Sequence, residues 1–138
     1  MILIINTTPL DHLEVILARK YDDFRIKKIP GRFNQAEKLL PAVSKLLAAQ
    51  KIKMEKIRAI GVVIGPGGFT SVRIGVAVAN GLGYGLNLPI VGIKKDEFID
   101  NNDLTEKIFE RVKMLKPAKL VMPFYDREPN ITMAKVKK

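Results

Sequence analysis

The chain has 138 residues, a formal net charge of +10, 47% hydrophobic residues and no cysteine. This length suits one domain, or one domain with a small appendage, and the apolar content is sufficient for a buried core. The lack of cysteine excludes disulfides and thiolate metal sites and fits a reducing cytoplasm. No apolar run is long enough to cross a bilayer, and the first residues, MILIINTT, lack the basic region and cleavage site of a secretory signal.

Basic residues are spread along the chain, with two groups of mild local density. These groups are Arg25, Lys27, Lys28 and Arg32, and Lys51, Lys53, Lys56 and Arg58. Excess positive charge either gives solubility or attracts a polyanion such as RNA. No aromatic residues interleave these bases, so direct recognition of single-stranded RNA has little support.

Three strands are predicted before the first helix. Residues 2–5 form a continuous apolar run, which is typical of a central strand buried on both faces. Residues 13–18 and 24–29 form the next two strands, and the short connection between them favours an antiparallel hairpin.

The first helix is predicted to begin near Asn34, a good N-cap, with Glu37 at the capping-box position. Its apolar residues recur at offsets of three, four and seven: Ala36, Leu39, Leu40, Val43, Leu46 and Leu47. Pro41 removes one backbone hydrogen bond, so the helix is expected to kink or restart there.

A glycine-rich stretch, GPGGFTSVRIGVAVANGLGYGL, occupies residues 65–86 and follows a fourth predicted strand at residues 58–64. Four loop-forming residues open it, and the rest is almost wholly apolar or small. Thr70 is predicted to cap a helix there. The order strand, glycine turn, helix is compatible either with phosphate binding or with close packing alone.

Within this second helix, Gly75, Ala79 and Gly83 recur every four residues along one line. A glycine inside a helix costs about 0.5–1 kcal/mol relative to alanine. Several small residues in line indicate that a close approach of another backbone offsets that loss.

The remaining predicted elements are a strand at residues 89–93, a helix at residues 104–115 capped by Asp103, and a short strand at residues 120–124. The order up to residue 93 is three strands, helix, strand, helix, strand. It matches one half of the actin/Hsp70/sugar-kinase architecture, in which nucleotide binds between two such halves. We therefore expect a first lobe at residues 1–93 and a reduced second segment at residues 94–138.

Four segments together resemble a known family: ILIINTT, LLPAVSKLL, GPGGFTSVRIGVAVANGLGYGLNLPIVGI and PFYDREPNIT. They look like the TsaB (YeaZ) family of tRNA threonylcarbamoyladenosine biosynthesis proteins. The resemblance covers residues 1–93 and returns at residues 121–132. It implies an α/β actin-like (ASKHA, RNase H-like) half-fold with a mixed five-stranded sheet and a truncated second lobe.

The resemblance implies a cytoplasmic, non-catalytic scaffold without cofactor or metal. It implies contact with a TsaD-like catalytic subunit and a TsaE-like ATPase, a homodimer when alone, and indirect contact with tRNA. The first helix and the glycine-loop helix are the implied interface. The residues assigned to that interface are Leu39, Leu40, Val43, Phe69, Thr70, Val72, Arg73, Gly75, Val76, Ala79, Asn80 and Gly83.

The sequence offers limited support for catalysis. The glycine loop lacks the Gly-Lys-Ser/Thr that follows a Walker loop, and Asn6 stands where relatives commonly keep an aspartate that positions metal and phosphate. His12 is the only histidine, so a His-pair zinc site cannot form, and nothing in the spacing supports a triad with Ser44 or Ser71.

Two other functions remain open at this point. One is a stand-alone nucleotide-binding or ATP-using enzyme of the actin-like class. The other is a basic RNA-binding module, whose affinity would depend strongly on salt. Arg73, the one charge in the apolar helix, either pairs with an acid across an interface or reaches solvent along its stem.

Overall fold

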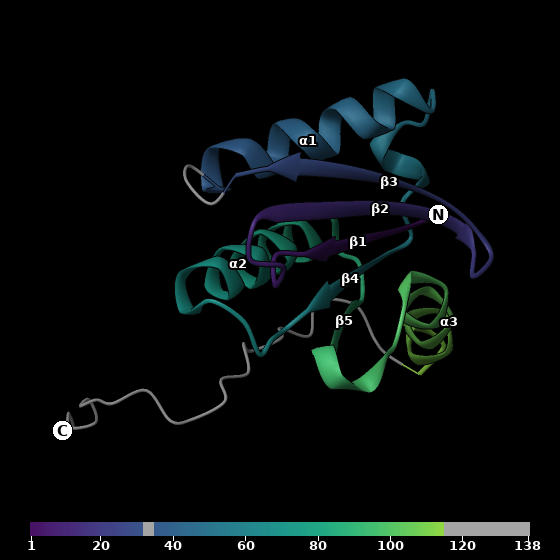
Figure 1. Ribbon diagram of the computed structural model, residues 1–138. Coiled ribbons are helices and arrows are strands. Elements are labelled where there is room, and N and C mark those ends of the chain that lie inside the picture. The colour runs from purple at the N-terminus through teal and green to yellow at the C-terminus, as the bar shows by residue number, and fades with distance from the viewer. Residues whose placement is uncertain (32–34, 115–138) are drawn as a thin grey trace, which may run out of the picture.

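The computed structural model describes residues 1–31 and 35–114. Within these ranges the chain forms five strands, three α-helices and two short 3₁₀ turns (Figure 1). In chain order the elements are β1 (Ile2–Asn6), β2 (His12–Lys20), β3 (Asp23–Pro30), α1 (Gln35–Ala49), η1 (Met54–Lys56), β4 (Ala59–Val63), α2 (Phe69–Leu86), β5 (Ile90–Ile93), η2 (Lys95–Glu97) and α3 (Asn101–Val112).

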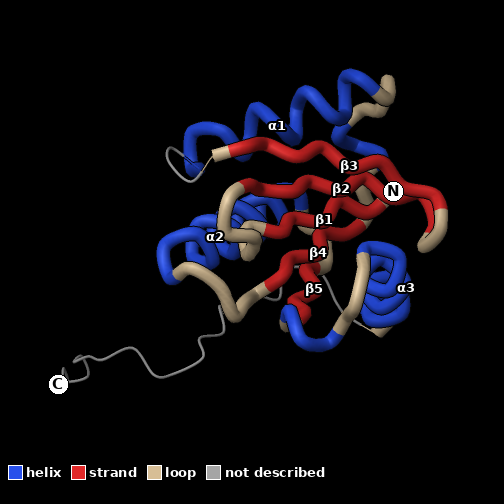
Figure 2. Tube along the Cα trace, in the orientation of Figure 1, coloured by secondary structure: helices blue, strands red, loops and turns tan. Residues whose placement is uncertain are grey.

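The five strands form one mixed sheet in the order β3-β2-β1-β4-β5 (Figure 2). The β1–β2 and β2–β3 pairs are antiparallel, whereas β1–β4 and β4–β5 are parallel. Strand β1 lies at the centre, where Ile4 pairs with Ile16 on one side and Gly61 on the other. The predicted mixed five-stranded sheet is confirmed, as is the antiparallel hairpin.

Helices cover both faces of the sheet (Figure 1). Side chains of one parity, such as Leu3 and Ile5 of β1, pack with the buried stripes of α1 and α2. Side chains of the other parity, such as Ile2 and Ile4, pack with Leu104 and Ile108 of α3. A strand covered on both faces must be apolar at every position, which explains the continuous run in β1.

Helix α1 buries Leu39, Val43 and Leu46 against the sheet, as its periodicity predicts. Two residues assigned to that face, Ala36 and Leu40, are instead exposed, because the buried stripe is narrower than the apolar one. The helix runs without a break through Pro41, so of the two predicted alternatives, a kink or a restart, the restart is wrong. The predicted cap, Asn34, lies outside the described residues.

Helix α2 begins at Phe69, and Gly68 is its N-cap, with no side chain bonding to the first turn. The backbone carbonyl of Gly68 accepts the N–H of Val72. The predicted cap at Thr70 is therefore wrong, because Thr70 already lies within the first turn. The helix ends at Leu86, its C-cap Asn87 is in the left-handed conformation, and the N–H of Leu88 bonds back to the carbonyl of Gly83.

Helix α3 begins and ends three residues earlier than predicted. Its N-cap is Asp100, whose carboxylate accepts the N–H of Asp103 at 2.8 Å, so the assignment of the cap to Asp103 is wrong. Both aspartates stand close to the helix start, and the extended backbone of Asp100 decides between them. Helix α3 packs on the sheet that residues 1–93 form.

The strand predicted at residues 120–124 and the family-like segment at residues 121–132 lie outside the described residues. Among the helices described, none is long and apolar enough to span a membrane.

Candidate functional site

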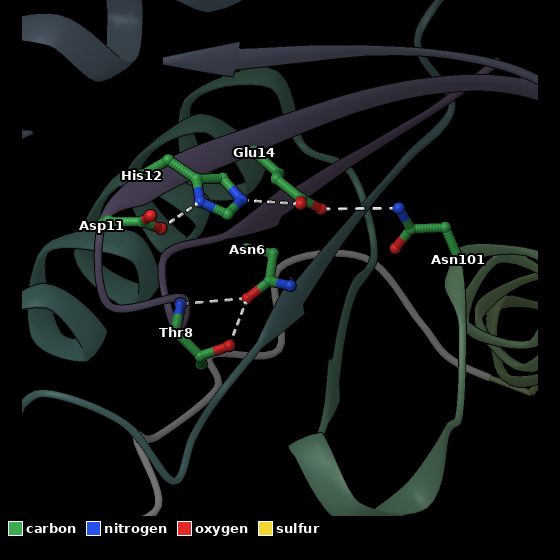
Figure 3. A network of polar contacts seen from close by, with 6 residues as sticks. All are labelled: Asn6, Thr8, Asp11, His12, Glu14 and Asn101. Atoms are coloured by element: carbon green, nitrogen blue, oxygen red, sulfur yellow. Dashed lines mark hydrogen bonds and ion pairs between the residues drawn. The ribbon is translucent and has the colours of Figure 1, made fainter. Parts of the chain in front are cut away.

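A compact polar cluster lies at the carboxyl end of β1, at the centre of the sheet (Figure 3). Asn6, Thr7 and Thr8 are all buried there. The Asn6 side-chain oxygen accepts two hydrogen bonds from Thr8, from its backbone N–H at 3.0 Å and from its hydroxyl at 2.7 Å. Asn6 is thus committed to holding its own loop in a tight turn.

His12 lies beside this loop with a carboxylate at each ring nitrogen (Figure 3). Its Nδ1 is 2.7 Å from Asp11 Oδ1, and its Nε2 is 2.9 Å from Glu14 Oε2. The hydrogen bond with Asp11, followed by that with Glu14, raises the pKa of His12 above its usual value. The hydrogen bond to His12 in turn lowers the pKa of Asp11.

Glu14 extends the cluster toward α3. It is 8% exposed, and it lies directly opposite Asn6 in the β1–β2 register. The side-chain amide of Asn101, at the start of α3, donates to its Oε1 at 3.5 Å, a long contact. The cluster therefore joins β1, β2 and the first residue of α3 at one end of the sheet.

The glycine-rich loop packs against the other side of the β1 loop. A Cβ placed on Gly67 would lie 3.2 Å from Thr8 Cα, and one placed on Gly75 would lie 2.6 Å from Thr7 Oγ1. The Thr7 hydroxyl also donates to the carbonyl of Ser71 at 2.6 Å. The glycines therefore let α2 approach the β1 loop closely, which favours packing as their role.

The cluster offers little means of catalysis by its own residues. A Ser–His mechanism needs a ring nitrogen on the serine hydroxyl, yet both ring nitrogens of His12 contact carboxylates. Neither Ser44 nor Ser71 is thus activated by it. Within residues 1–31 and 35–114, no group of three His, Cys, Asp or Glu side chains is arranged to hold a metal ion.

The structure divides the twelve predicted interface residues into two sets. Leu40, Phe69, Thr70 and Arg73 are exposed, and Asn80 is half-buried. The remaining seven are buried inside the chain: Leu39, Val43, Val72, Gly75, Val76, Ala79 and Gly83.

The small-residue stripe faces the sheet of its own chain. Gly75 lies against Thr7, and a Cβ on Gly83 would lie 2.3 Å from Ile90 Cγ1. The close neighbour inferred from the sequence exists, but it belongs to the same chain and consists of the loop after β1 and strand β5. These small residues are therefore not available to a second subunit in this structure.

Arg73 lies on the exposed side of α2. Its guanidinium carbon is 5.0 Å from the centre of the Phe69 ring, one helical turn earlier, in a cation–π contact. Arg73 is therefore at the surface, which both of its predicted roles require.

Two features were missed by reasoning from the sequence. One is the link from His12 through Glu14 to Asn101, in which Glu14 and Asn101 are 87 positions apart. The other is a groove between β3 and α1, where Lys27 and Lys28 of the strand lie near Lys38 and Lys45 of the helix. The local signals for it were the seven-residue spacing of the two helix lysines and the basic residues of the strand.

The sheet order, with α1 and α2 on one face and α3 on the other, defines an actin-like (ASKHA) half-fold. YeaZ from Pseudomonas aeruginosa has a similar structure, with a TM-score of 0.62 and 28% identity over 67% of this chain and 43% of that one.

The sequence model of the family described as "TsaD: tRNA N6-adenosine threonylcarbamoyltransferase" matches residues 33–108, more than half of the chain. The chain belongs to this family. It is 36% identical over 84 residues to the tRNA threonylcarbamoyladenosine biosynthesis protein TsaB of Buchnera aphidicola (subspecies Baizongia pistaciae), covering 61% of the chain and 38% of the relative. It is 29% identical over 86 residues to TsaB of Haemophilus influenzae, covering 62% and 36%.

These matches confirm the resemblance to TsaB (YeaZ). The chain spans about two fifths of the length of the relatives it matches.

Proposed function

We propose that this chain is a non-catalytic partner subunit in the biosynthesis of tRNA N6-threonylcarbamoyladenosine, where it binds and activates a TsaD-like transferase. The names of its relatives support the pathway. The single observation that supports the non-catalytic role is the state of Asn6, whose side-chain oxygen is occupied by two hydrogen bonds from Thr8.

The Asn6 amide carries no charge. In active proteins of the actin-like architecture, an aspartate in this loop helps to position metal and phosphate, because hard cations prefer negatively charged oxygen ligands. The two nearby carboxylates, Asp11 and Glu14, both contact His12. None of the three side chains is therefore arranged to hold a magnesium–nucleotide complex.

The exposed sides of α1 and α2 supply a surface for the transferase. Leu40 of α1 is 47% exposed, and Phe69 of α2 is 48% exposed. Ile74, Val78 and Leu82 of α2 are each half-buried. Apolar side chains of this kind contribute most to binding when a partner removes them from water.

Co-purification with the TsaD-like subunit from the same organism tests the proposal. Size-exclusion chromatography with light scattering should show a complex whose mass is the sum of both chains. Leu40→Asp and Phe69→Asp should each weaken it by about tenfold or more, because a charge buried without a partner costs more than about 1.4 kcal/mol.

Ile99→Asp is the matched control, since Ile99 is 91% exposed and lies next to α3 rather than on α1 or α2. It should leave the complex intact. If all three variants, or none, lose binding, the exposed sides of α1 and α2 are not the contact surface.

We further infer that a TsaE-like ATPase joins this complex and that tRNA meets the chain only within it. When the transferase is absent, the same exposed apolar side chains allow a homodimer. Light scattering of the chain alone should then give twice the monomer mass, and Leu40→Asp should give monomers. A wild-type chain that is monomeric at all concentrations contradicts the homodimer.

The competing function is that of a stand-alone ATP-using enzyme. Titration calorimetry with ATP and magnesium distinguishes the two. The isolated chain should release no binding heat, whereas micromolar binding contradicts the non-catalytic role. Asn6→Asp is the informative variant, because it restores the carboxylate and keeps an acceptor for both Thr8 bonds.

A further inference from the structure

A basic groove runs between the outermost strand, β3, and helix α1, which lies above it in Figure 1. Its volume is about 330 Å³. The groove residues are Lys27, Lys28, Ile29, Pro30, Glu37, Lys38, Pro41, Ala42 and Lys45. Lys27, Lys38, Lys45 and Glu37 give it a formal charge of +2, over a floor that contains apolar side chains. The side chain of Lys28 alternates to the other face of the sheet, opposite Glu14.

The groove lysines form no ion pairs with the acidic residues that the structure describes. With the described residues, the Lys38 ammonium makes a long hydrogen bond of 3.4 Å to the carbonyl of Pro30. The positive charge of the groove is therefore available to an acidic ligand.

Strand β3 forms the edge of the sheet and pairs only with β2 among the described strands. The N–H of Gly31 donates toward β2, to the carbonyl of Asp11. Backbone groups alternate along an antiparallel strand, so those of Lys27 and Ile29 also point toward β2. Those of Ile26 and Lys28 point away from it.

Two contacts agree with this direction. The outward carbonyl of Pro30 is the one that Lys38 reaches, and the outward carbonyl of Phe24 accepts from Arg25. Pro30 has no N–H to offer, and proline is tolerated in a strand where its nitrogen faces away from the ladder. Beside the groove, β3 thus offers the donors and acceptors that another strand would need.

We propose that this groove binds an extended acidic segment of a partner protein, which pairs with β3 as a further strand of the sheet. Alternate side chains of such a segment face α1. Acidic residues at those positions meet Lys27, Lys38 and Lys45. The apolar floor, which includes Ile29 and Ala42, contacts the remainder of the segment.

The spacing of the lysines suits this arrangement. Lys38 and Lys45 are seven residues apart, or about 10 Å along the helix at 1.5 Å per residue. Three alternate residues of a strand span about 13 Å. The long lysine side chains accommodate the difference, so acids at every second position reach both helix lysines.

Charge also selects the partner. Lysines on an edge strand discourage pairing with neutral or basic strands, which is how many proteins protect their edges from aggregation. A segment with alternating acidic residues is instead attracted by these lysines. An RNA backbone would match the charge but would leave the backbone donors and acceptors of β3 unused.

The test uses the full chain and a fluorescein-labelled peptide of alternating glutamate and valine. Fluorescence anisotropy at low salt should show saturable binding. The same peptide with glutamine in place of glutamate should bind at least about tenfold more weakly, since three exposed ion pairs contribute up to about 1 kcal/mol each. Equal binding of the two peptides overturns the proposal.

Two triple variants test whether the peptide binds in the groove. The first variant should bind the acidic peptide about tenfold more weakly than the wild type. It combines Lys27→Gln, Lys38→Gln and Lys45→Gln. Lys51→Gln with Lys53→Gln and Lys56→Gln removes equal charge outside the groove and should change the affinity by less than about twofold. Equal losses in the two variants mean non-specific attraction and overturn the proposal.

A further pair tests strand pairing itself. Ile26→Pro removes one outward N–H and leaves the hydrogen bonds to β2 in place, so it should bind the peptide more weakly. Ile26→Ala keeps that N–H and should bind the peptide as the wild type does. Circular dichroism checks that both variants fold. If Ile26→Pro does not fold, a peptide N-methylated at alternate residues replaces it and should bind more weakly than the parent peptide.

Competition with tRNA settles the class of partner. Unfractionated tRNA that binds this groove more tightly than the peptide, and loses that affinity only in the groove variant, overturns the proposal. Leu40→Asp should leave peptide binding unchanged, so failure here is distinguishable from failure of the transferase interface.

Discussion

The two faces of the sheet are covered by different helices, although the strands present apolar side chains to both faces. Helices α1 and α2 together cover one face, and the core there joins buried side chains of both helices to those of β1, β2, β4 and β5. Among the described helices, only α3 packs on the other face, and that face ends in the polar cluster of Asn6, His12 and Glu14. The first face provides mainly apolar packing, and the second adds a polar connection between β2 and α3.

Removing core volume should give the largest effects. Leu39→Ala, on the buried side of α1, should lower the free energy of unfolding by about 2–5 kcal/mol. Ile108→Ala, on the buried side of α3, should cost less within that range, because a single helix can shift to fill the cavity. Urea denaturation measures both, and Leu40→Ala on the exposed side of α1 should change stability by less than about 0.5 kcal/mol. A larger loss from Ile108→Ala contradicts this ranking of the faces.

Substituting alanine for two glycines of α2 should distinguish a closely packed position from an open one. Gly83→Ala should destabilise by about 1–3 kcal/mol, because the added Cβ would lie 2.3 Å from Ile90 Cγ1 and 3.3 Å from the carbonyl of Leu88. Gly81→Ala should stabilise by about 0.5–1 kcal/mol, because its Cβ would meet nothing within 4 Å. Thermal unfolding of both variants tests this, and equal effects would show that α2 does not lie as close to β5 as described.

The cap of α3 should matter less. Asp100→Ala removes the side chain that accepts the N–H of Asp103 and should cost about 1 kcal/mol. Asp100→Ser keeps an acceptor and should retain most of that stability. Hydrogen exchange should show faster exchange in α3 of the alanine variant, while α1 and α2 stay protected. Faster exchange in all three helices would mean that the two faces unfold as one unit.

The pH dependence of the polar cluster should be the smallest effect. The pKa of His12 is raised by its contacts with Asp11 and Glu14, so charged His12 stabilises the folded chain fully below the ordinary imidazole pKa of about 6.5. This contribution is lost as the pH rises through the raised value. The stability difference between wild type and His12→Gln should therefore shrink over that range in urea denaturation. A difference that grows with pH contradicts the raised pKa.

Periodicity predicted the elements that carry one dominant pattern. The apolar run of β1 and the offsets of Leu39, Val43 and Leu46 in α1 determined both burial and element type. Helix starts were less predictable, because Asp100 and Asp103 are equally good capping residues and only the backbone of Asp100 distinguishes them.

The direction in which a patterned face points could not be predicted. A stripe such as Gly75, Ala79 and Gly83 has the same sequence signature whether it meets a second chain or the sheet of its own chain. Likewise, the proximity of Lys27 to Lys38 depends on how α1 crosses β3, and nothing local to either segment determines it. The actin-like order of elements was predictable, whereas the groove arises only from tertiary packing.

The central position of β1 has a consequence for how the chain acquires its structure. One edge of β1 is completed early by β2, but the other waits for β4, whose Ile60 pairs with Leu3 across more than fifty residues. Until that distant segment arrives, an apolar strand with an open edge is exposed. The interval before β4 docks is therefore when the nascent chain is most prone to aggregate and most in need of a chaperone.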